Sequence, residues 1–460
     1  MDARGYRRYW DEERETRDPA RRDVLILERI QHQLHYAYER LPFYRRHYDT
    51  AGFHPDQVQS LADFTAKVPI ITKKMLVEDQ RDNPLFGTYQ GDVADDDVAR
   101  IQGSSGTSGI PTFYRVSRRD WERAADVHAM AQWAAGLRPC DIAQISFPFS
   151  LFFGGWGVIQ GAERVGASVF PLGPIESDRQ LELMFKLGAT CFSATPSYCL
   201  HLIGVAEQLG LDLASGPVQR LLVGGEPGGS VPATVARITE AWGASVHDAG
   251  STSEMYPFQT NITTEALNGV MLFTDEVYTE IVHRDDPHQP LPDGERGAIV
   301  YTHLWRDSQP MIRFWPGDET YMTHEPSSCG RTYPRLPEGI VGRLDDMLII
   351  RGANVYPSNI EAGLRSTDGL GAEFTITVER RGVLDEMTVQ AELSPETAAE
   401  LATLSADDAQ ARRAAIRAEA ERQLKAQTQI RVPVELLEPG ALPETVFKAR
   451  RVIDLRGEAT

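Results

Sequence analysis

The stretch Gly103-Ser-Ser-Gly-Thr-Ser-Gly-Ile-Pro111 carries the strongest local signal in the chain. Its glycines let the backbone curl so that several N–H groups converge, and its serines and threonine add hydroxyl donors. Such a loop can hold a phosphate group without a positive side chain. It lacks the Gly-Lys-Ser/Thr of a Walker A loop. The alternative is a flexible Ser/Gly linker. Because Thr112-Phe-Tyr-Arg-Val116 is typical of a strand, we favour a phosphate-binding loop.

The regions on either side of this loop differ in pattern. Residues 1–95 are expected to be mostly helical: apolar residues recur at helical spacing from Asp23 to Leu41, and Pro42 ends that helix. Another helix is expected to begin after Thr72, with the threonine side chain as its cap. From about residue 100 to 340, β-type runs alternate with helices. This alternation predicts an α/β domain with helix-covered β-sheets, whose strands include Ala143–Phe147, Ala167–Pro171, Arg220–Val223, Ser245–His247 and 296–303.

A Pro-, Gly- and Ser-rich stretch from Glu325 to Gly342 predicts a domain boundary, and Asp285–Gly294 is expected to be a turn. We therefore predict a large domain at 1–342 and a small α+β domain at 343–460. The small domain is expected to contain three strands and a charged helix, at Glu373–Val378, Glu386–Leu393, Val432–Leu437 and Asp407–Gln427.

Composition narrows the function classes. The 460 residues carry a net charge of −19, which disfavours binding to nucleic acid or to an anionic membrane. The four cysteines are far apart, as expected in a reducing compartment. The N-terminus lacks an apolar signal segment. The uncharged run 142–162 contains Pro148 and several glycines, so we expect buried strand and loop rather than a spanning helix. A cytoplasmic protein is expected.

Further motifs stand in a fixed order after the glycine loop. They are Ala194-Thr-Pro-Ser-Tyr198, Gly224-Gly-Glu-Pro227, Asp248-Ala-Gly-Ser-Thr-Ser-Glu254, Met311-Ile-Arg-Phe-Trp-Pro-Gly-Asp318, Cys329-Gly-Arg-Thr332 and Gly342-Arg-Leu-Asp-Asp-Met-Leu-Ile-Ile-Arg-Gly-Ala-Asn-Val-Tyr-Pro357. The set resembles the phenylacetate–CoA ligase family of adenylate-forming enzymes over nearly the whole chain. The resemblance implies a large N-terminal domain and a small mobile C-terminal domain. It also implies a reaction in which ATP converts a carboxylate to an acyl adenylate, and a thiol, usually CoA, then accepts the acyl group.

The resemblance implies a nucleotide site built from several of these motifs. Glu254 would support Mg²⁺, a hard cation that prefers oxygen ligands, and Asp318 would accept hydrogen bonds from the ribose hydroxyls. The phosphates would be held by Ser104, Ser105, Gly106, Thr107, Ser108 and Gly109. The remaining nucleotide-binding residues would be Gly225, Glu226, Pro227, Asp248, Ala249, Gly250, Ser251, Thr252, Ser253 and Arg343.

The same resemblance assigns roles near the C-terminus. Lys448 would be catalytic, because its ammonium would stabilise the charge that develops during adenylation. Asp345 would lie at the hinge of the mobile domain. A thiol tunnel would be lined by Arg351, Gly352 and Ala353, and Gly352 suits a close backbone approach.

The acyl pocket is expected around Phe147-Pro-Phe-Ser-Leu-Phe-Phe-Gly-Gly-Trp156. Aromatic side chains beside glycines suit an aryl acid, although ordinary core packing is the alternative for part of this run. The candidate substrate contacts are Phe147, Phe149, Phe152, Gly154, Tyr198 and His247.

One departure from the family pattern concerns the phosphate loop. Many relatives carry a lysine in or just after it, where this chain has Ile110 and Thr112. The phosphates must then be held by backbone, hydroxyl groups and Mg²⁺, or by a basic residue from elsewhere.

Three hypotheses follow from these motifs. The first is an aryl-acid–CoA ligase that uses ATP, Mg²⁺ and CoA. The second is an enzyme that activates an aryl acid for an amine, a carrier protein or another nucleophile. The third is a degenerate nucleotide-binding protein without activity. A homodimer is expected from the resemblance alone.

Overall fold

The computed structural model describes residues 4–91, 93–104, 112–151, 153–226, 228–255, 259–344, 348–350, 353–381, 384–428, 430–443 and 451–455. The chain divides into two compact units. The first comprises Met1–Ser193, Pro217–Val223 and Ser245–Ile340, and the second comprises Ala194–Gly216, Gly224–Ala244 and Val341–Thr460. The domain boundary at 342 stays a prediction, since the second unit also includes two segments from the middle of the chain.

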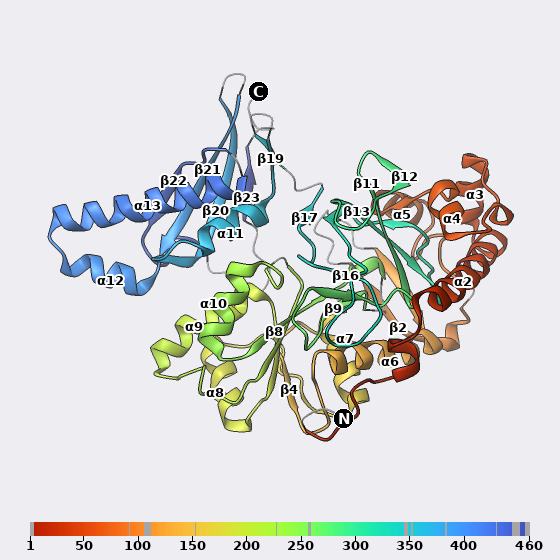
Figure 1. Cartoon of the computed structure of the whole chain (residues 1–460), viewed down its shortest axis with the longest axis horizontal. Helices are drawn as coiled ribbons and strands as arrows, with labels where there is room; N and C mark the ends of the chain where they lie inside the picture. Colours follow the sequence, from red (N-terminus) through yellow and green to blue (C-terminus); the bar gives the residue numbers. More distant parts are fainter. Residues whose placement is uncertain are drawn as a thin grey trace. The chain divides into compact units, whose positions relative to one another are not determined.

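Helices dominate the first 90 residues, as the sequence predicts (Figure 1). The long α2 (Pro19–Arg40) starts earlier than expected, because Asp18 caps it by accepting a hydrogen bond from Arg21 N and Pro19 fits its first turn. Pro42 ends α2 and begins α3. The other helical segments here are α1 (Glu12–Glu15), α3 (Pro42–Ala51), α4 (Leu61–Lys67), α5 (Lys73–Asp82) and the short η1 (Pro55–Gln57) and η2 (Asp95–Asp97).

The larger sheet of the first unit has the strand order β16-β10-β9-β8-β7-β6-β4-β5. β4 pairs in parallel with β5 and β6, and β7 with β8, whereas the pairs from β8 to β16 are antiparallel. The α/β prediction is therefore confirmed. The bounds are β4 (Ile142–Ile145), β5 (Ser168–Phe170), β6 (Cys191–Ala194), β7 (Arg220–Val223), β8 (Ser245–Gly250), β9 (Asn261–Thr263), β10 (Val270–Leu272) and β16 (Arg335–Leu336).

A second sheet has the order β1-β14-β13-β11-β12, with β15 paired to β13. The turn predicted at Asp285–Gly294 is partly wrong, because Asp286–Pro290 forms strand β12. β12 lies at the edge of the sheet, where its two prolines cost fewer ladder hydrogen bonds. The other bounds are β1 (Ile71–Thr72), β11 (Val277–His283), β13 (Gly297–His303), β14 (Phe314–Trp315) and β15 (Asp318–Thr320).

The uncharged run 142–162 is only partly the expected strand and loop, since its second half belongs to helix α7 (Gly154–Val165). α7 packs against α6 (Arg118–Ala134). A Cβ atom on Gly157 would lie 2.6 Å from the His128 ring, and one on Gly161 would lie 2.4 Å from Gln132 Nε2. The glycines thus allow close helix packing, which outweighs their poor helix propensity. Helix α8 (Ser177–Leu187) follows.

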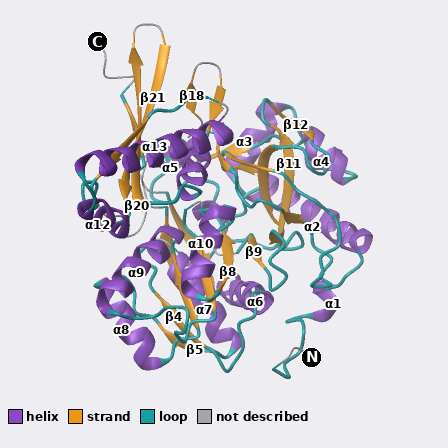
Figure 2. Ribbon diagram, turned by 60° about the vertical axis from the view of Figure 1, so that its left-hand side comes forward, coloured by secondary structure: helices purple, strands orange, loops and turns teal. Residues whose placement is uncertain are grey.

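The second unit contains the predicted α+β segment. Its sheet has the order β22-β21-β20-β23, and α13 (Ala406–Thr428) runs along the sheet (Figure 2). Ile416, Ala420 and Leu424 of α13 are fully buried in the same core as Phe374 and Val389 of the sheet. The other bounds are β17 (Gly342–Arg343), β18 (Leu348–Ile350), β19 (Ala353–Val355), β20 (Leu370–Arg381), β21 (Leu384–Leu393), β22 (Val434–Leu437), β23 (Val452–Asp454), α9 (Pro196–Leu209), α10 (Pro232–Trp242), α11 (Pro357–Arg365) and α12 (Pro395–Thr403).

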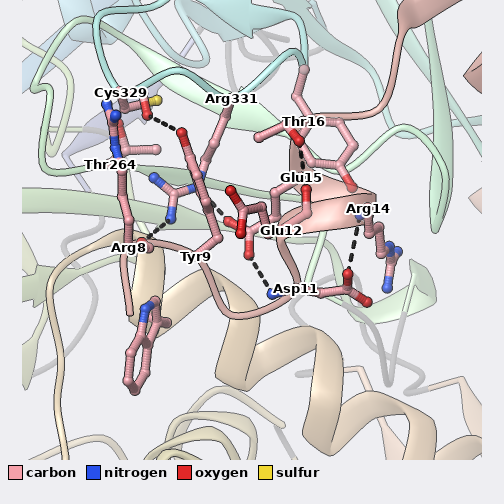
Figure 3. Close-up of polar contacts among 12 residues, drawn as sticks. Arg8, Tyr9, Asp11, Glu12, Arg14, Glu15, Thr16, Thr264, Cys329 and Arg331 are labelled. Atoms are coloured by element: carbon pink, nitrogen blue, oxygen red, sulfur yellow. Dashed lines mark hydrogen bonds and ion pairs between the residues drawn. The ribbon is translucent and has the colours of Figure 1, made fainter. Parts of the chain in front are cut away.

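Polar contacts fix the N-terminal segment to the first unit (Figure 3). Asp11 caps α1 by accepting from Arg14 N, and its own N–H donates to Glu15 Oε1 at 2.8 Å. Glu15 is fully buried and pairs with Arg331. The Tyr9 hydroxyl donates to the Cys329 carbonyl at 3.4 Å. The buried Glu15–Arg331 pair therefore ties the start of the chain to a loop 316 residues away.

Across the described part of the chain, no helix combines the length and apolar character needed to cross a bilayer.

Candidate active site

The glycine-rich loop that the sequence predicts to bind phosphate connects the two strands of an antiparallel hairpin, β2 (Val98–Gly103) and β3 (Phe113–Ser117). Its base is fixed by Ser104, whose Oγ accepts hydrogen bonds from Thr112 N at 3.0 Å and Thr112 Oγ1 at 3.2 Å. Gln80 of α5 bonds to both the N–H and the carbonyl of Phe113. Helix α5 therefore holds the hairpin at the point where the loop ends.

Glu254 lies in the short 3₁₀ turn η3 (Ser253–Met255), which two buried residues hold by its backbone carbonyls. His303 Nε2 donates to the Met255 carbonyl at 2.7 Å, and Arg306 Nη1 lies 3.3 Å from the Glu254 carbonyl. Burial lowers the pKa of His303 well below its usual range. His303 is therefore neutral, and its Nδ1 accepts from Met311 N.

The Glu254 side chain is only 7% exposed. Its Oε1 atom lies 3.3 Å from Lys73 Nζ, within ion-pair distance. Among the described residues, Glu254 Oε1 and Thr252 Oγ1 are nonetheless buried atoms without a hydrogen-bond partner. Both are the hard oxygen donors that Mg²⁺ prefers. The turn therefore fits a magnesium ion.

Asp318 is the first residue of β15 and follows Gly317, whose φ of 89° permits the sharp turn from β14. β15 pairs with β13, with Glu319 opposite Ala298, so Asp318 lies beside the stretch of β13 that leads to Tyr301. Burial and then the Asp318 carboxylate raise the pKa of Tyr301. Tyr301 and His303 are two residues apart on β13, so they share one face of the strand and stand roughly 7 Å apart. One strand therefore links Asp318 to the Glu254 turn, and both predicted nucleotide contacts occupy the same region.

The carboxyl end of β8 carries Asp248, Ala249 and Gly250. Gly250 N donates to Asn261 Oδ1 at 2.7 Å, and a Cβ atom at position 250 would lie 2.5 Å from that oxygen. A larger residue at position 250 would therefore force the Asn261 side chain to move. Ser251, Thr252 and Ser253 lead from this strand end into the Glu254 turn.

His247 is buried within β8 instead of facing an open pocket. Its Nδ1 lies 2.9 Å from the Thr263 carbonyl, which can only accept, so Nδ1 carries the proton. Its Nε2 therefore accepts from Ser245 Oγ at 2.8 Å. Burial lowers the pKa of His247 to about 4. Both ring nitrogens already have partners in the fold, and the predicted contact with the acid stays untested.

Two predicted residues, Glu226 and Tyr198, belong to the second unit. The Glu226 carboxylate accepts from Ser197 N at 2.8 Å at the start of α9, beside the Thr195 cap that accepts from Tyr198 N. Burial raises the pKa of Glu226. Tyr198 stacks on His201, with ring centroids 5.7 Å apart. Gly225, with φ 88°, supplies the bend before Glu226, and Arg343 lies in β17 of this unit.

The expected acyl-pocket run forms an aromatic cluster in the first unit. Phe149 contacts Trp156 at 5.4 Å between ring centroids, and Phe153 contacts both Trp121 and His128 of α6. Phe147 is buried, and Gly154 begins α7. Sequence reasoning missed Trp121 and His128, although their seven-residue spacing at one helix face is a signal that could have found them.

Several predicted residues lie outside the described residues: Ser105, Gly106, Thr107, Ser108, Gly109, Phe152, Pro227, Asp345, Arg351, Gly352 and Lys448. Ala353, by contrast, begins β19, where its backbone pairs with Ile350.

Comparison with known families tests these motifs. Residues 25–304 match the model of the AMP-binding enzyme family, and residues 352–456 match the AMP-binding enzyme C-terminal domain. The chain belongs to the AMP-binding enzymes. The phenylacetate-coenzyme A ligase of Thermus thermophilus is 35% identical over 93% of this AMP-binding enzyme and 95% of the relative. The Escherichia coli enzyme of the same name is 35% identical over 94% of each chain. The resemblance to the phenylacetate–CoA ligase family is therefore confirmed.

Solved structures agree with this assignment. A 2-hydroxyisobutyryl-CoA ligase in its postadenylation state is 41% identical, with a TM-score of 0.92 over 99% of this chain and 94% of that one. The same ligase in its thioesterification state, with acyl-AMP and CoA bound, is 42% identical, with a TM-score of 0.73 over 97% of this chain and 92% of that one. This AMP-binding enzyme therefore has the fold of an adenylate-forming ligase.

Proposed function

We propose that this enzyme uses ATP to activate an aromatic carboxylic acid as its acyl adenylate and then transfers the acyl group to the thiol of CoA. The observation that carries the proposal is the convergence of Glu254, Asp318 and the base of the glycine loop in one unit of an AMP-binding enzyme. A carboxylate is a poor electrophile, and adenylation supplies it with a good leaving group. The relatives named phenylacetate-coenzyme A ligase support an aryl acid and CoA as substrates.

The chain's own residues have separate tasks in this scheme. The loop from Ser104 to Gly109 would hold the phosphates through backbone and hydroxyl donors. Asp318 would orient the ribose, and Lys448 would stabilise negative charge that develops as the acid attacks the α-phosphate. Glu254 and Thr252 would hold Mg²⁺. The ion would supply charge neutralisation for the triphosphate.

The second half-reaction needs the thiol to reach the same carbonyl. We infer that the C-terminal domain moves about Asp345 and brings Arg351, Gly352 and Ala353 to the thiol path. The solved relative is described in both a postadenylation and a thioesterification state, which supports such a two-state scheme.

A second candidate substrate class is a small branched 2-hydroxy acid. It is favoured by the 2-hydroxyisobutyryl-CoA ligase, whose identity of 41% exceeds that of the phenylacetate enzymes. The aromatic cluster around Phe149 and Phe153 instead favours an aryl acid, through stacked and edge-to-face contacts.

The deciding experiment is ATP–pyrophosphate exchange with phenylacetates, benzoates, cinnamates and 2-hydroxyisobutyrate, followed by detection of the CoA thioester. Exchange and thioester with an aryl acid are expected. A preference for the hydroxy acid would replace the substrate class. Exchange without a thioester would favour an amine or carrier-protein acceptor. Binding of AMP without exchange for any acid would favour a non-catalytic protein.

A further inference from the structure

The glycine-rich loop lacks the lysine that many relatives carry, and a basic residue from elsewhere is one way to hold the triphosphate in an acidic protein. In the described part of the chain, Lys73 is the basic residue within ion-pair distance of the Glu254 carboxylate, at 3.3 Å. Arg306 is also near this turn, but it is fully buried and donates to Gln309 and to backbone. Lys73 is 37% exposed at its side chain and can reach a ligand.

The position of Lys73 in its helix is unfavourable for a purely structural lysine. It is the first residue of α5, whose first turn contains two lysines and no acidic residue. A helix N-terminus carries partial positive charge and favours anions over cations. The predicted cap is also absent, because Thr72 makes no side-chain hydrogen bond to the first turn. Its strand conformation, with φ −121° and ψ 160°, instead serves the pairing of Thr72 with Trp315.

The surroundings of α5 place this positive charge beside the predicted nucleotide contacts. Lys73 and Gln80 are seven residues apart and therefore share one helix face. Gln80 holds Phe113 at the end of the glycine loop. Thr72 pairs with Trp315, three residues before Asp318. The start of β3, the Glu254 turn and the strand that precedes Asp318 thus all contact α5 or the residue before it.

We propose that Lys73 is the phosphate-binding lysine of this enzyme and replaces the lysine missing from the glycine-rich loop. Without nucleotide, it balances the Glu254 carboxylate, whose Oε1 has no hydrogen-bond partner in the described part of the chain. On binding of the triphosphate, the Lys73 ammonium would move from Glu254 to a phosphate oxygen, and the Glu254 carboxylate would then be available to hold Mg²⁺. This inference rests on the proposed function for its catalytic consequence, but not for nucleotide binding.

The test compares Lys73→Met with Lys74→Met. Lys74 is the matched control, because it neighbours Lys73 on α5, is 84% exposed and pairs only loosely with Glu78 at 3.9 Å. Lys73→Met should weaken ATP binding at least tenfold by calorimetry and leave adenosine binding within twofold. Lys74→Met should change neither by more than twofold. Lys73→Arg should recover part of the ATP affinity, since it restores the charge.

Activity separates this inference from the proposed function. With an accepted acid, Lys73→Met should lower ATP–pyrophosphate exchange at least tenfold, while a preformed acyl adenylate still yields thioester. The melting temperature serves as the folding control, because Lys73→Met removes a charge that opposes the helix dipole but also removes the ion-pair partner of the Glu254 carboxylate. Equal ATP affinity in wild type and Lys73→Met overturns the inference, as does an equal loss of ATP and adenosine binding. If wild type shows no exchange with any acid, the proposed function fails while the binding comparison still decides the role of Lys73.

Discussion

The close packing of α6 and α7 yields a quantitative prediction for Gly157→Ala. A Cβ atom at this position would lie 2.4 Å from the Phe153 ring and 2.6 Å from the His128 ring. Carbon atoms in ordinary contact are about 3.5–4.0 Å apart. At least one ring must therefore move by about 1 Å, and both rings belong to the aromatic cluster of the expected acyl pocket.

The size of the effect follows from two opposing terms. Overpacking of a core costs about 1–3 kcal/mol, whereas alanine in place of glycine gains about 1 kcal/mol of helix propensity. Gly157→Ala should therefore destabilise the α6–α7 region by about 0–2 kcal/mol. Gly204 of α9 provides the matched control, because a Cβ atom there would meet nothing within 4 Å. Gly204→Ala should stabilise its helix by up to about 1 kcal/mol.

Amide hydrogen exchange is the suitable assay, because it reports the opening free energy of each helix separately in a chain of this size. Protection in α7 should fall in Gly157→Ala, and protection in α9 should rise in Gly204→Ala. The Michaelis constant for the acid should also rise in Gly157→Ala, because Phe153 is displaced. If protection of α7 instead rises in Gly157→Ala, as protection of α9 should in Gly204→Ala, the two helices do not pack as closely as described.

The remaining predictions concern pH and close contacts. The folded pKa of His247 is about 4, and an unfolded histidine has a pKa near 6.5. Unfolding therefore takes up a proton between these pH values, so the free energy of unfolding should fall by about 3 kcal/mol as pH drops from 7 to 4. His247→Asn should make the free energy of unfolding, measured by urea titration, depend less on pH. An unchanged pH dependence would contradict a buried neutral ring. Burial raises the folded pKa of Glu226. Its contribution to the stability of the fold is therefore greatest below about pH 4.3 and declines as pH rises through the folded pKa. Glu226→Gln, whose amide oxygen can still accept from Ser197 N, should be at least as stable as wild type at pH 7, and a lower melting temperature there would refute the argument. Gly250→Ala should lower the melting temperature, because its Cβ would lie 2.5 Å from Asn261 Oδ1; an unchanged value would show that Asn261 moves aside freely.

The sequence predicts elements well where local pattern and packing agree. Arg220–Val223 forms a strand with the expected bounds, and the charged helix predicted at Asp407–Gln427 differs by one residue at each end. The sequence-based prediction is wrong where a partner distant in sequence determines which element forms. α7 forms despite its glycines because α6 lies close against them, and β12 forms in a Pro-rich stretch because β11 offers it an edge.

The candidate site shows the same division. Glu254 and Asp318 are predicted as site residues from motifs, because those motifs keep their order along the chain, and both roles stay predictions. Lys73 lies outside every motif. It is placed near the candidate site by two contacts of the fold, the pairing of Thr72 with Trp315 and the hydrogen bond between Gln80 and Phe113. Trp121 and His128 likewise become part of the aromatic cluster through α6–α7 packing.

The turn that carries Glu254 is anchored through its peptide carbonyls, by His303 and Arg306, and not through its side chain. The hydrogen bonds that hold the backbone of this turn therefore do not involve the Glu254 carboxylate, whose charged neighbour is Lys73. Glu254→Gln should preserve the backbone of the turn while changing the charge offered to a cation. Because the backbone of the turn is held independently, substitutions at position 254 are suited to trapping the enzyme with bound nucleotide. They are also suited to changing its preference among divalent ions without altering the surrounding protein.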